Sequence, residues 1–125
     1  MDLKDKVILI TGGSDGLGYA SAELLSSEGA KVIICGRRGD YLNEKAKTIS
    51  EKTNNNVLAI QADVSKAEDC KRLVEETISK FKKIDILVNN AGASAAALFE
   101  DVSDKNWEDD INLKLMSTIR MCRLV

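Results

Sequence analysis

A short apolar run, Val7 to Ile10, leads directly into the glycine-rich stretch 11–18, and a helical pattern follows. A buried strand that turns this sharply into a helix needs glycines, because glycine adopts positive φ without a steric penalty. The unpaired N–H groups and the dipole at the start of that helix favour an anion. The stretch therefore predicts a nucleotide-phosphate site. The residues expected there are Gly12, Ser14, Asp15, Gly16, Leu17 and Gly18.

The spacing of these glycines excludes two common nucleotide-binding motifs. Gly13 and Gly18 have the separation found in a P-loop, but Tyr19 and Ala20 stand where the phosphate-binding lysine and the Mg²⁺-binding Ser or Thr belong. The dinucleotide pattern G-x-G-x-x-G also fails, because the stretch reads G-x-x-x-G-x-G from Gly12. An ATPase or GTPase is therefore not predicted.

Four apolar runs alternate with helical patterns along the chain. Short apolar runs bounded by turn residues are typical of strands covered on both faces. Alternating strands and helices predict an α/β fold, a Rossmann-like doubly wound parallel sheet in strand order 3-2-1-4, as one domain over residues 1–125. The expected strands are Val7–Ile10, Lys31–Cys35, Val57–Ala62 and Ile84–Val88.

The helices are expected between these strands and after the last one. The first ends at Gly29, the second runs from Asp40 to about Lys52, and the third ends near Phe81. Ser65-Lys66-Ala67-Glu68 has the pattern of a capping box and predicts the start of the third helix. The last helix, from about Ser103, is expected to bury two faces. Its two apolar stripes are Trp107, Ile111 and Leu115, and Leu113, Met116 and Leu124.

Charge and composition narrow the function. The 18 Lys and Arg against 20 Asp and Glu leave a net charge of -2 without a block of like charge, so neither nucleic acid nor a membrane surface is an expected partner. The absence of histidine excludes Ser-His-Asp and Cys-His catalysis and His-ligated metal sites. Three dispersed cysteines and a charged N-terminus without a targeting pattern predict a cytoplasmic protein, and no metal site is expected.

The end of the second strand carries a signal for the kind of nucleotide. In a dinucleotide-binding fold this position reads the adenosine ribose, where an acid binds the 2′-OH of NAD. Here Gly36 is followed by Arg37 and Arg38, which leave room for a 2′-phosphate and can pair with it. The sequence therefore favours NADP(H) over NAD(H).

Three motifs in order resemble the short-chain dehydrogenase/reductase family. They are T-G-x-x-x-G-x-G at residues 11–18, Asp63-Val64 after the third strand, and N-N-A-G at residues 89–92 after the fourth. The resemblance implies that Asp63 binds the adenine amine and that Val64 packs near the base. It also implies that N-N-A-G steadies the central sheet and lets backbone approach the cofactor. The additional cofactor-binding residues are then Asp63, Val64, Asn90, Ala91 and Gly92.

The same resemblance raises one conflict at the glycine turn. Many NADP-preferring members of the family carry a basic residue just before the second glycine, whereas this chain has Asp15. A carboxylate there is expected to repel a 2′-phosphate. A comparison of NADP(H) with NAD(H) binding is needed to decide between the arginine and aspartate signals.

The resemblance implies an oxidoreductase that interconverts a small carbonyl and alcohol by hydride transfer, but no catalytic residue is predicted here. The family's Ser and Tyr-x-x-x-Lys lie in a second half of the fold. Tyr41 and Lys45 match the letters, yet they fall near the adenosine end of the site. The family's helix Asn falls on Lys114, with Asn112 two residues away. We therefore expect the cofactor-binding half of such an enzyme, truncated within its last helix and inactive alone.

The residues also allow two other interpretations. A stand-alone, non-catalytic nucleotide-binding module would self-associate through the apolar edge strand Ile84–Val88 and the last helix, and a homo-oligomer is expected. A flavodoxin-like or receiver-type domain shares the alternation of strands and helices. It explains neither the glycine spacing nor N-N-A-G.

Overall fold

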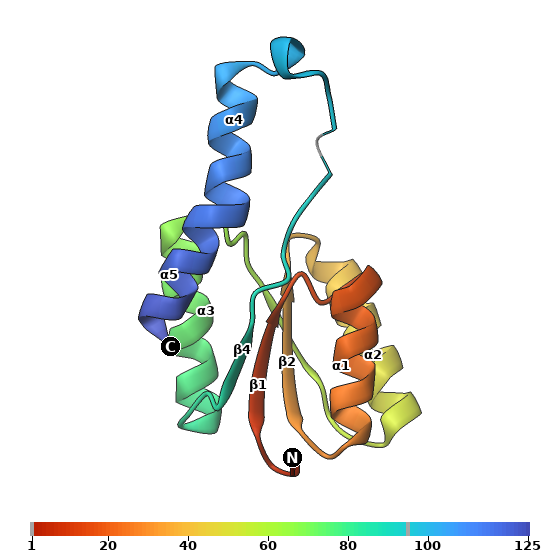
Figure 1. Cartoon of the computed structure of the whole chain (residues 1–125). Helices are drawn as coiled ribbons and strands as arrows, with labels where there is room; N and C mark the ends of the chain where they lie inside the picture. The colour runs from red at the N-terminus through yellow and green to blue at the C-terminus, as the bar shows by residue number, and fades with distance from the viewer. Residues whose placement is uncertain (1, 95) are drawn as a thin grey trace.

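The computed structural model describes residues 2–94 and 96–125, and in this part of the chain four parallel strands form one sheet (Figure 1). Their order is β3-β2-β1-β4, which confirms the order predicted from the sequence. The strands are β1 (Val7–Thr11), β2 (Lys31–Gly36), β3 (Leu58–Gln61) and β4 (Ile86–Val88).

The strand β1 lies inside the sheet and sets its register. Its residue Thr11 lies opposite Cys35 of β2, and Ile10 lies opposite Val88 of β4. The expected fourth strand began at Ile84, whereas β4 begins at Ile86. Just before β4, Asp85 makes two contacts with Val7: its N–H donates to the Val7 carbonyl oxygen at 2.9 Å, and its carboxylate accepts the Val7 N–H at 2.8 Å.

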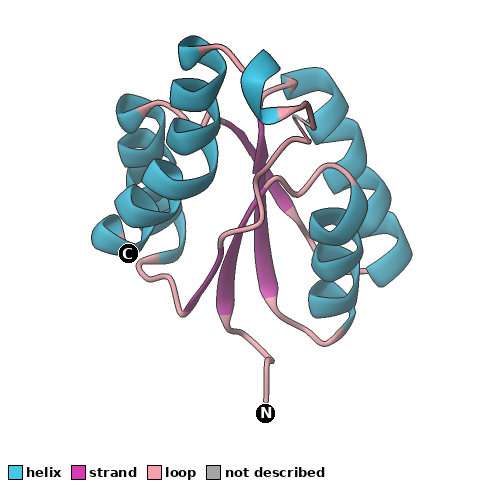
Figure 2. Cartoon of the chain, turned by 45° about the horizontal axis from the view of Figure 1, so that its top comes forward, coloured by secondary structure: helices cyan, strands magenta, loops and turns pink. Residues whose placement is uncertain are grey.

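Helices cover both faces of the sheet (Figures 1 and 2). Ile8 and Ile10 of β1 face α1 and α2, whereas Val7 and Leu9 face α3 and α5, because successive strand residues point to opposite faces. These four β1 side chains are at most 1% exposed, as expected for a central parallel strand. The helices in question are α1 (Gly16–Ser27), α2 (Gly39–Thr53), α3 (Ala67–Phe81) and α5 (Ser117–Leu124).

The helix α3 does not begin with the predicted capping box. Lys66 is its N-cap residue, and no side chain caps it there. Ser65 precedes this N-cap position, and its hydroxyl is turned toward the Asp63 carboxylate, to which it donates at 2.7 Å. The capping-box prediction was therefore wrong, because the helix begins one residue later than the pattern requires and Ser65 bonds within the preceding turn.

The last helix is broken into three parts: α4 (Asp104–Ile111), a π-helical turn η2 (Asn112–Met116), and α5. The Ser103 hydroxyl oxygen accepts the Asn106 N–H and caps α4, as the predicted start near Ser103 allows. The face of α5 that includes Ser117 and Met121 is buried against α3.

The prediction that this helix buries two faces was wrong. Trp107, Ile111 and Leu115 are 43%, 46% and 55% exposed. They form a continuous apolar stripe with Ile119, because these residues recur every four positions. In the other stripe, Leu113 packs against the core on the α3 side, whereas Leu124 is 40% exposed. The apolar pattern is the same in both stripes and does not show which of their residues meets a neighbouring element.

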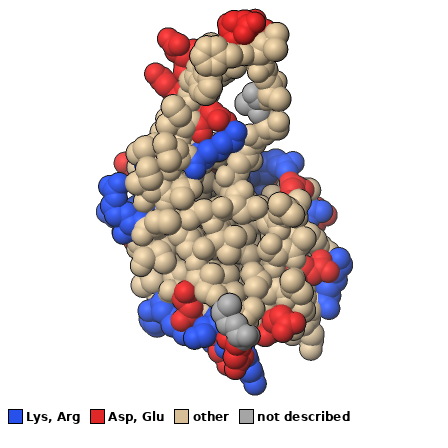
Figure 3. Space-filling view, in the orientation of Figure 1, with Lys and Arg blue, Asp and Glu red and all other residues tan. Residues whose placement is uncertain are grey.

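Residues 96–111, which include the turn η1 (Phe99–Asp101) and α4, form an arch above the carboxyl ends of the strands (Figures 1 and 3). Acidic side chains gather on the outer end of this arch in the space-filling view. Across the described ranges, none of the helices combines the length and apolar character needed to cross a membrane.

Candidate functional site

A cavity of about 390 Å³ opens at the carboxyl ends of β1, β2 and β4. Ligands of doubly wound sheets bind at this edge, beside the point where the strand order reverses. All of the predicted site residues except Gly18 line the cavity, and four others join them. The lining residues are Gly12, Ser14, Asp15, Gly16, Leu17, Cys35, Gly36, Arg37, Arg38, Ala62, Asp63, Val64, Asn90, Ala91, Gly92 and Leu113.

The glycine turn lines one side of the cavity, and its glycines have different roles. Gly12 and Gly16 have φ of 67° and 53°, which non-glycine residues rarely adopt. A Cβ on Gly18 would lie 2.2 Å from the Gly12 carbonyl oxygen, so Gly18 allows α1 to pack against the turn. A Cβ on Gly16 would meet nothing within 4 Å. The turn thus leaves space for a ligand beside Gly16.

Asn90 and Thr11 hold this turn against β4. The Asn90 side-chain amide donates to the carbonyl oxygens of Thr11 and Gly12 at 3.1 and 3.0 Å. In return, the Thr11 hydroxyl oxygen accepts the N–H groups of Asn90 and Ala91, both at 3.0 Å. The first and last motifs of the sequence are therefore joined by four hydrogen bonds, which fix the backbone of the turn.

The first turn of α1 begins without a side-chain cap. Asp15 is the N-cap residue, and its carboxylate accepts no hydrogen bond from the helix N–H groups. It accepts instead from the Tyr41 hydroxyl at 2.5 Å and from Arg38 at 2.8 Å. The Tyr41 hydrogen bond, with the nearby charge of Arg38, lowers the pKa of Asp15. The helix start keeps its partial positive charge available to a bound anion.

The two arginines after β2 differ in their contacts. The Arg38 guanidinium pairs with Asp15 and lies 4.1 Å from the centre of the Tyr41 ring. In residues 2–94 and 96–125, the Arg37 guanidinium takes part in no ion pair, and only the backbone oxygen of Arg37 is bonded, by the Gln61 amide at 2.8 Å. One arginine thus compensates the aspartate of the turn, while the other keeps its charge at the cavity.

Asp63 and Val64 lie on the opposite side of the cavity, where the chain leaves β3. The Asp63 oxygen Oδ1 accepts the N–H and the hydroxyl of Ser65 at 3.1 and 2.7 Å. Val64 is buried and packs into the core beside α3. Within the described ranges, the second carboxylate oxygen of Asp63 takes part in no hydrogen bond, so it can accept one from a ligand.

Of the four additional lining residues, Gly36 was noted in the sequence at the end of the second strand, and the other three were not predicted. Cys35 and Ala62 lie at or just after strand ends, so the rule that ligands bind at carboxyl ends could have identified them. Burial raises the pKa of the Cys35 thiol to about 12, which keeps it protonated at neutral pH. Leu113 reaches the cavity from the π-helical turn, for which the sequence carries no comparable signal.

The positions compared with the family's helix Asn lie on different sides of η2. Lys114 pairs with Asp110 at 2.7 Å and lines neither this cavity nor the one beside it. Asn112 lines the neighbouring cavity of about 240 Å³, together with Arg37 and Asp63. The structure therefore brings Asn112, and not Lys114, toward the predicted adenosine side. Among the described residues, no cluster of three or more His, Cys, Asp or Glu could hold a metal ion.

Comparison with known proteins agrees with this geometry. The family model described as short chain dehydrogenase matches residues 6–125. "11-beta-hydroxysteroid dehydrogenase-like 2" of Arabidopsis thaliana is 43% identical over 110 residues, which are 86% of this chain and 36% of that protein. The chain belongs to the short-chain dehydrogenase family.

Solved structures show the same fold with cofactors bound. L-Sorbose reductase from Gluconobacter frateurii, in complex with NADPH and L-sorbose, matches the whole chain with a TM-score of 0.95 at 36% identity, over 48% of its own length. The NADH-dependent reductase A1-R′, in complex with NAD, matches 98% of the chain with a TM-score of 0.89 at 30% identity, over 51% of its own length. The chain thus spans about a third of the plant relative and about half of these structures.

Proposed function

We propose that residues 6–125 bind NADP(H) in the cavity at the carboxyl edge of the sheet. The observation that carries the proposal is the glycine turn with its uncapped helix, held open toward this cavity by Asn90. The pyrophosphate is assigned to the turn and to the start of α1. The adenine is assigned to the space between Asp63 and the arginines, with Val64 beside it.

The proposed preference for NADP(H) over NAD(H) rests on the different contacts of Arg37 and Arg38. Arg38 and Tyr41 bind Asp15, which reduces the repulsion that this carboxylate would exert on a 2′-phosphate. Arg37 is left to pair with the phosphate, and charge-assisted contacts of this kind are about twice as strong as neutral hydrogen bonds. The contacts of Asp15 with Arg38 and Tyr41 therefore support a preference for NADP(H) despite this carboxylate.

For the whole protein we propose an oxidoreductase that interconverts a carbonyl and an alcohol. The bound nicotinamide supplies or accepts the hydride. Both the names of the relatives and the sugar bound by the sorbose reductase support a small carbonyl or alcohol as substrate. These 125 residues contribute cofactor binding and orientation. Tyr41, the tyrosine of the Tyr-x-x-x-Lys match, donates to Asp15 and so serves the adenosine side, and we expect the chain alone to be inactive.

A stand-alone nucleotide-binding module that self-associates is the second candidate. It is supported by the stripe of Trp107, Ile111, Leu115 and Ile119, and by the edge position of β4. In either case we propose a homo-oligomer, and a cytoplasmic location stays a prediction. The two candidates differ in whether a catalytic Ser and Tyr-x-x-x-Lys are encoded after Val125.

Calorimetric titration of the chain with NADPH and NADH tests the cofactor proposal. We expect NADPH to bind at least about tenfold more tightly, the effect of one charge-assisted contact. The variant Arg37→Ala removes the phosphate contact and should bring the two affinities together. Lys47→Ala is the matched control, because Lys47 is an exposed cation of α2 that pairs only with Glu51 among the ion pairs described. Equal affinities in the unaltered chain would refute the preference.

A further inference from the structure

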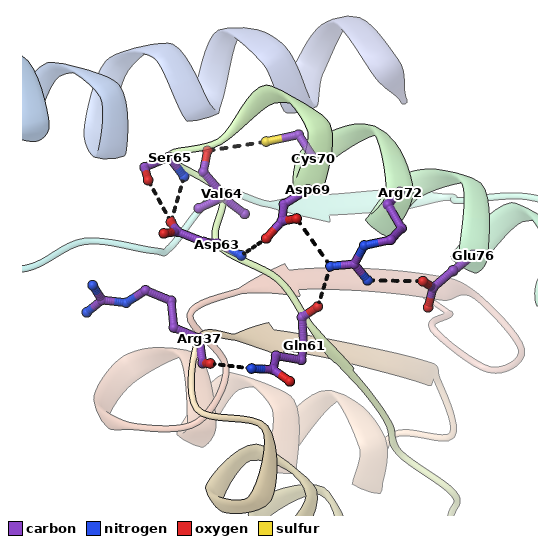
Figure 4. Close-up of polar contacts among 9 residues, drawn as sticks. All are labelled: Arg37, Gln61, Asp63, Val64, Ser65, Asp69, Cys70, Arg72 and Glu76. Carbon is purple, nitrogen blue, oxygen red and sulfur yellow. Dashed lines mark hydrogen bonds and ion pairs between the residues drawn. The ribbon is translucent and has the colours of Figure 1, made fainter.

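A chain of polar contacts joins α3 to both sides of the proposed adenosine site (Figure 4). It begins at Asp69 and Arg72, which lie in the first two turns of α3 and line neither cavity of the site. It ends on the backbone of Asp63 and Arg37, which line both. The contacts therefore connect residues outside the site to the two residues expected to read the adenine and the 2′-phosphate.

Asp69 holds the turn that carries Asp63. One oxygen of its carboxylate accepts the Asp63 N–H at 2.7 Å, and the Asp63 carbonyl oxygen accepts the Lys66 N–H at 2.9 Å. The hydrogen bond from the Asp63 N–H, with the nearby charge of Arg72, lowers the pKa of Asp69. The carboxylate is therefore ionised at neutral pH, in the form that best binds a backbone N–H.

Arg72 extends the contacts to the other side of the site. One guanidinium nitrogen lies 3.4 Å from Asp69 and donates to the Gln61 carbonyl oxygen at 2.8 Å. The other nitrogen donates to Glu76 at 3.0 Å, which fixes the plane of the guanidinium. The Gln61 side-chain amide in turn donates to the Arg37 carbonyl oxygen at 2.8 Å. The end of β3 is thus held between α3 and the start of the arginine segment.

We propose that Asp69 and Arg72 are positioning residues for the adenosine end of the cofactor. Asp69 sets the place of the Asp63 carboxylate, and Arg72 sets the place of Arg37 through Gln61. Neither residue touches the cofactor. The inference rests on the proposed function, since it concerns the same site. It assigns selectivity to two arms of one network. The Asp69 arm, Asp69 to Asp63, controls selectivity for the base, and the Arg72 arm, from Arg72 through Gln61 to Arg37, controls selectivity for the 2′-phosphate.

The Asp69 arm is tested with NADPH and with its analogue in which hypoxanthine replaces adenine. Hypoxanthine has an oxygen where adenine has the amine, so a well-placed Asp63 carboxylate should reject it by about tenfold. In Asp69→Ala this ratio should fall to about threefold or less, because the turn loses its anchor. The variant Asp69→Asn keeps an oxygen that accepts the Asp63 N–H and should restore most of the ratio.

Glu75→Ala is the control for this arm, because Glu75 lies on the same helix and pairs only with Lys71 among the ion pairs described. It should leave the ratio unchanged. A loss of stability alone lowers the affinity for both nucleotides together and does not change their ratio. An unchanged ratio in Asp69→Ala therefore refutes the positioning role. If Asp69→Ala does not fold, Asp69→Leu, which has a similar branched shape but no acceptor, gives the same test: a ratio of about threefold or less supports the role, and an unchanged ratio refutes it.

The Arg72 arm is tested by the ratio of NADPH to NADH affinity. Arg72→Met keeps an unbranched stem as far as the Nε position and removes the donors, so the ratio should fall by about threefold or more while the base selectivity falls less. Equal losses in both ratios would contradict the division into two arms. If the unaltered chain binds no NADPH, or does not prefer it to the analogue, the proposed function itself is refuted. If the unaltered chain shows both selectivities and the variants keep the same two affinity ratios, only the positioning role of Asp69 and Arg72 is refuted.

Discussion

The sheet with α1, α2 and α3 differs from the arch in how its apolar residues are covered. In the sheet, Ile8, Leu9 and Ile10 are fully buried between helices on both faces. In and just after the arch, Trp107 and Leu115 are 43% and 55% exposed, although their helical spacing marks them as part of a packing face. The difference shows that periodicity identifies an apolar face but not the element that covers it.

The arch keeps local order without a core of its own. Ser103 caps α4, and the rings of Phe99 and Trp107 pack edge to face with their centres 5.9 Å apart. Lys105 pairs with Asp109 at 2.9 Å along the exposed side of the helix. Contacts of this kind contribute a few tenths of a kcal/mol to about 1.5 kcal/mol each, far less than burial of a side chain. We therefore expect mutations to have large effects in the sheet and small ones in the arch.

The largest effect is expected at the glycine turn. In Gly18→Val the new side chain meets the Gly12 carbonyl oxygen and the Asn90 amide, so the free energy of unfolding should fall by about 3 kcal/mol and NADPH binding should be lost. Urea denaturation measures the first effect and calorimetry the second. Gly16→Ala is the control, because its Cβ meets no atom and costs only about 1 kcal/mol for the positive φ. Equal losses of unfolding free energy in the two variants would argue against a steric clash at Gly18.

A smaller effect is expected at Asn90. The variant Asn90→Ala leaves the carbonyl oxygens of Thr11 and Gly12 without their donor, which should lower the free energy of unfolding by about 2 kcal/mol. Urea denaturation of the neighbouring variant Asn89→Ala provides the comparison, since the Asn89 side chain contacts only the Cys122 sulfur among the hydrogen bonds described. A loss as large in Asn89→Ala would contradict the role of Asn90 as the clamp.

Acid should weaken the sheet through Asp85. The N–H of Val7 and then the Lys83 ammonium lower the pKa of Asp85 below its ordinary 3.8. A carboxyl group whose pKa is lower in the folded state stabilises the fold above pH 3.8, and this stabilisation is lost as the pH falls through the folded-state pKa. The variant Asp85→Asn should therefore show a flatter decline of stability in acid, measured by denaturation between pH 5 and pH 2. An unchanged slope would argue against this contact.

The smallest effect on stability is expected in the exposed stripe. The double variant Ile111→Ser and Leu115→Ser should lower the free energy of unfolding by only about 1 kcal/mol or less, because both side chains are already about half exposed to solvent. The same variant should reduce self-association, measured by light scattering over a range of concentrations. A loss of stability without any change in association would instead place a covering element of this chain on the stripe.

The sequence predicted the sheet because its signals there are local and consistent. A strand, a glycine turn and a helix follow one another in order, and right-handed crossovers leave few ways to connect them. The resemblance to the family's motifs identified Asp63 and Asn90, and the predicted strand ends placed both at the same edge of the sheet. Whether Arg37 or Arg38 is free could not be predicted, since this depends on Asp15 and Tyr41, which meet only in the folded chain.

Two errors have different physical causes. The capping box at Ser65 failed because the helix begins one residue later, after Lys66, and the Ser65 hydroxyl donates to the Asp63 carboxylate. The π-helical turn that carries Asn112 was missed because one inserted residue leaves the apolar spacing of a helix almost unchanged. Neither the exact helix start nor the inserted residue can be read from the pattern of residue types.

The uncapped start of α1 has a consequence for the lifetime of the folded chain. A ligand that binds only the folded state adds stability by mass action, about 2.7 kcal/mol at a hundred times its Kd. Asp15 leaves the first N–H groups of the helix without a side-chain partner. If NADP(H) binds as we propose, its phosphate completes this part of the helix, and the supply of the cofactor in the cell would help to determine how much of the protein survives proteolysis.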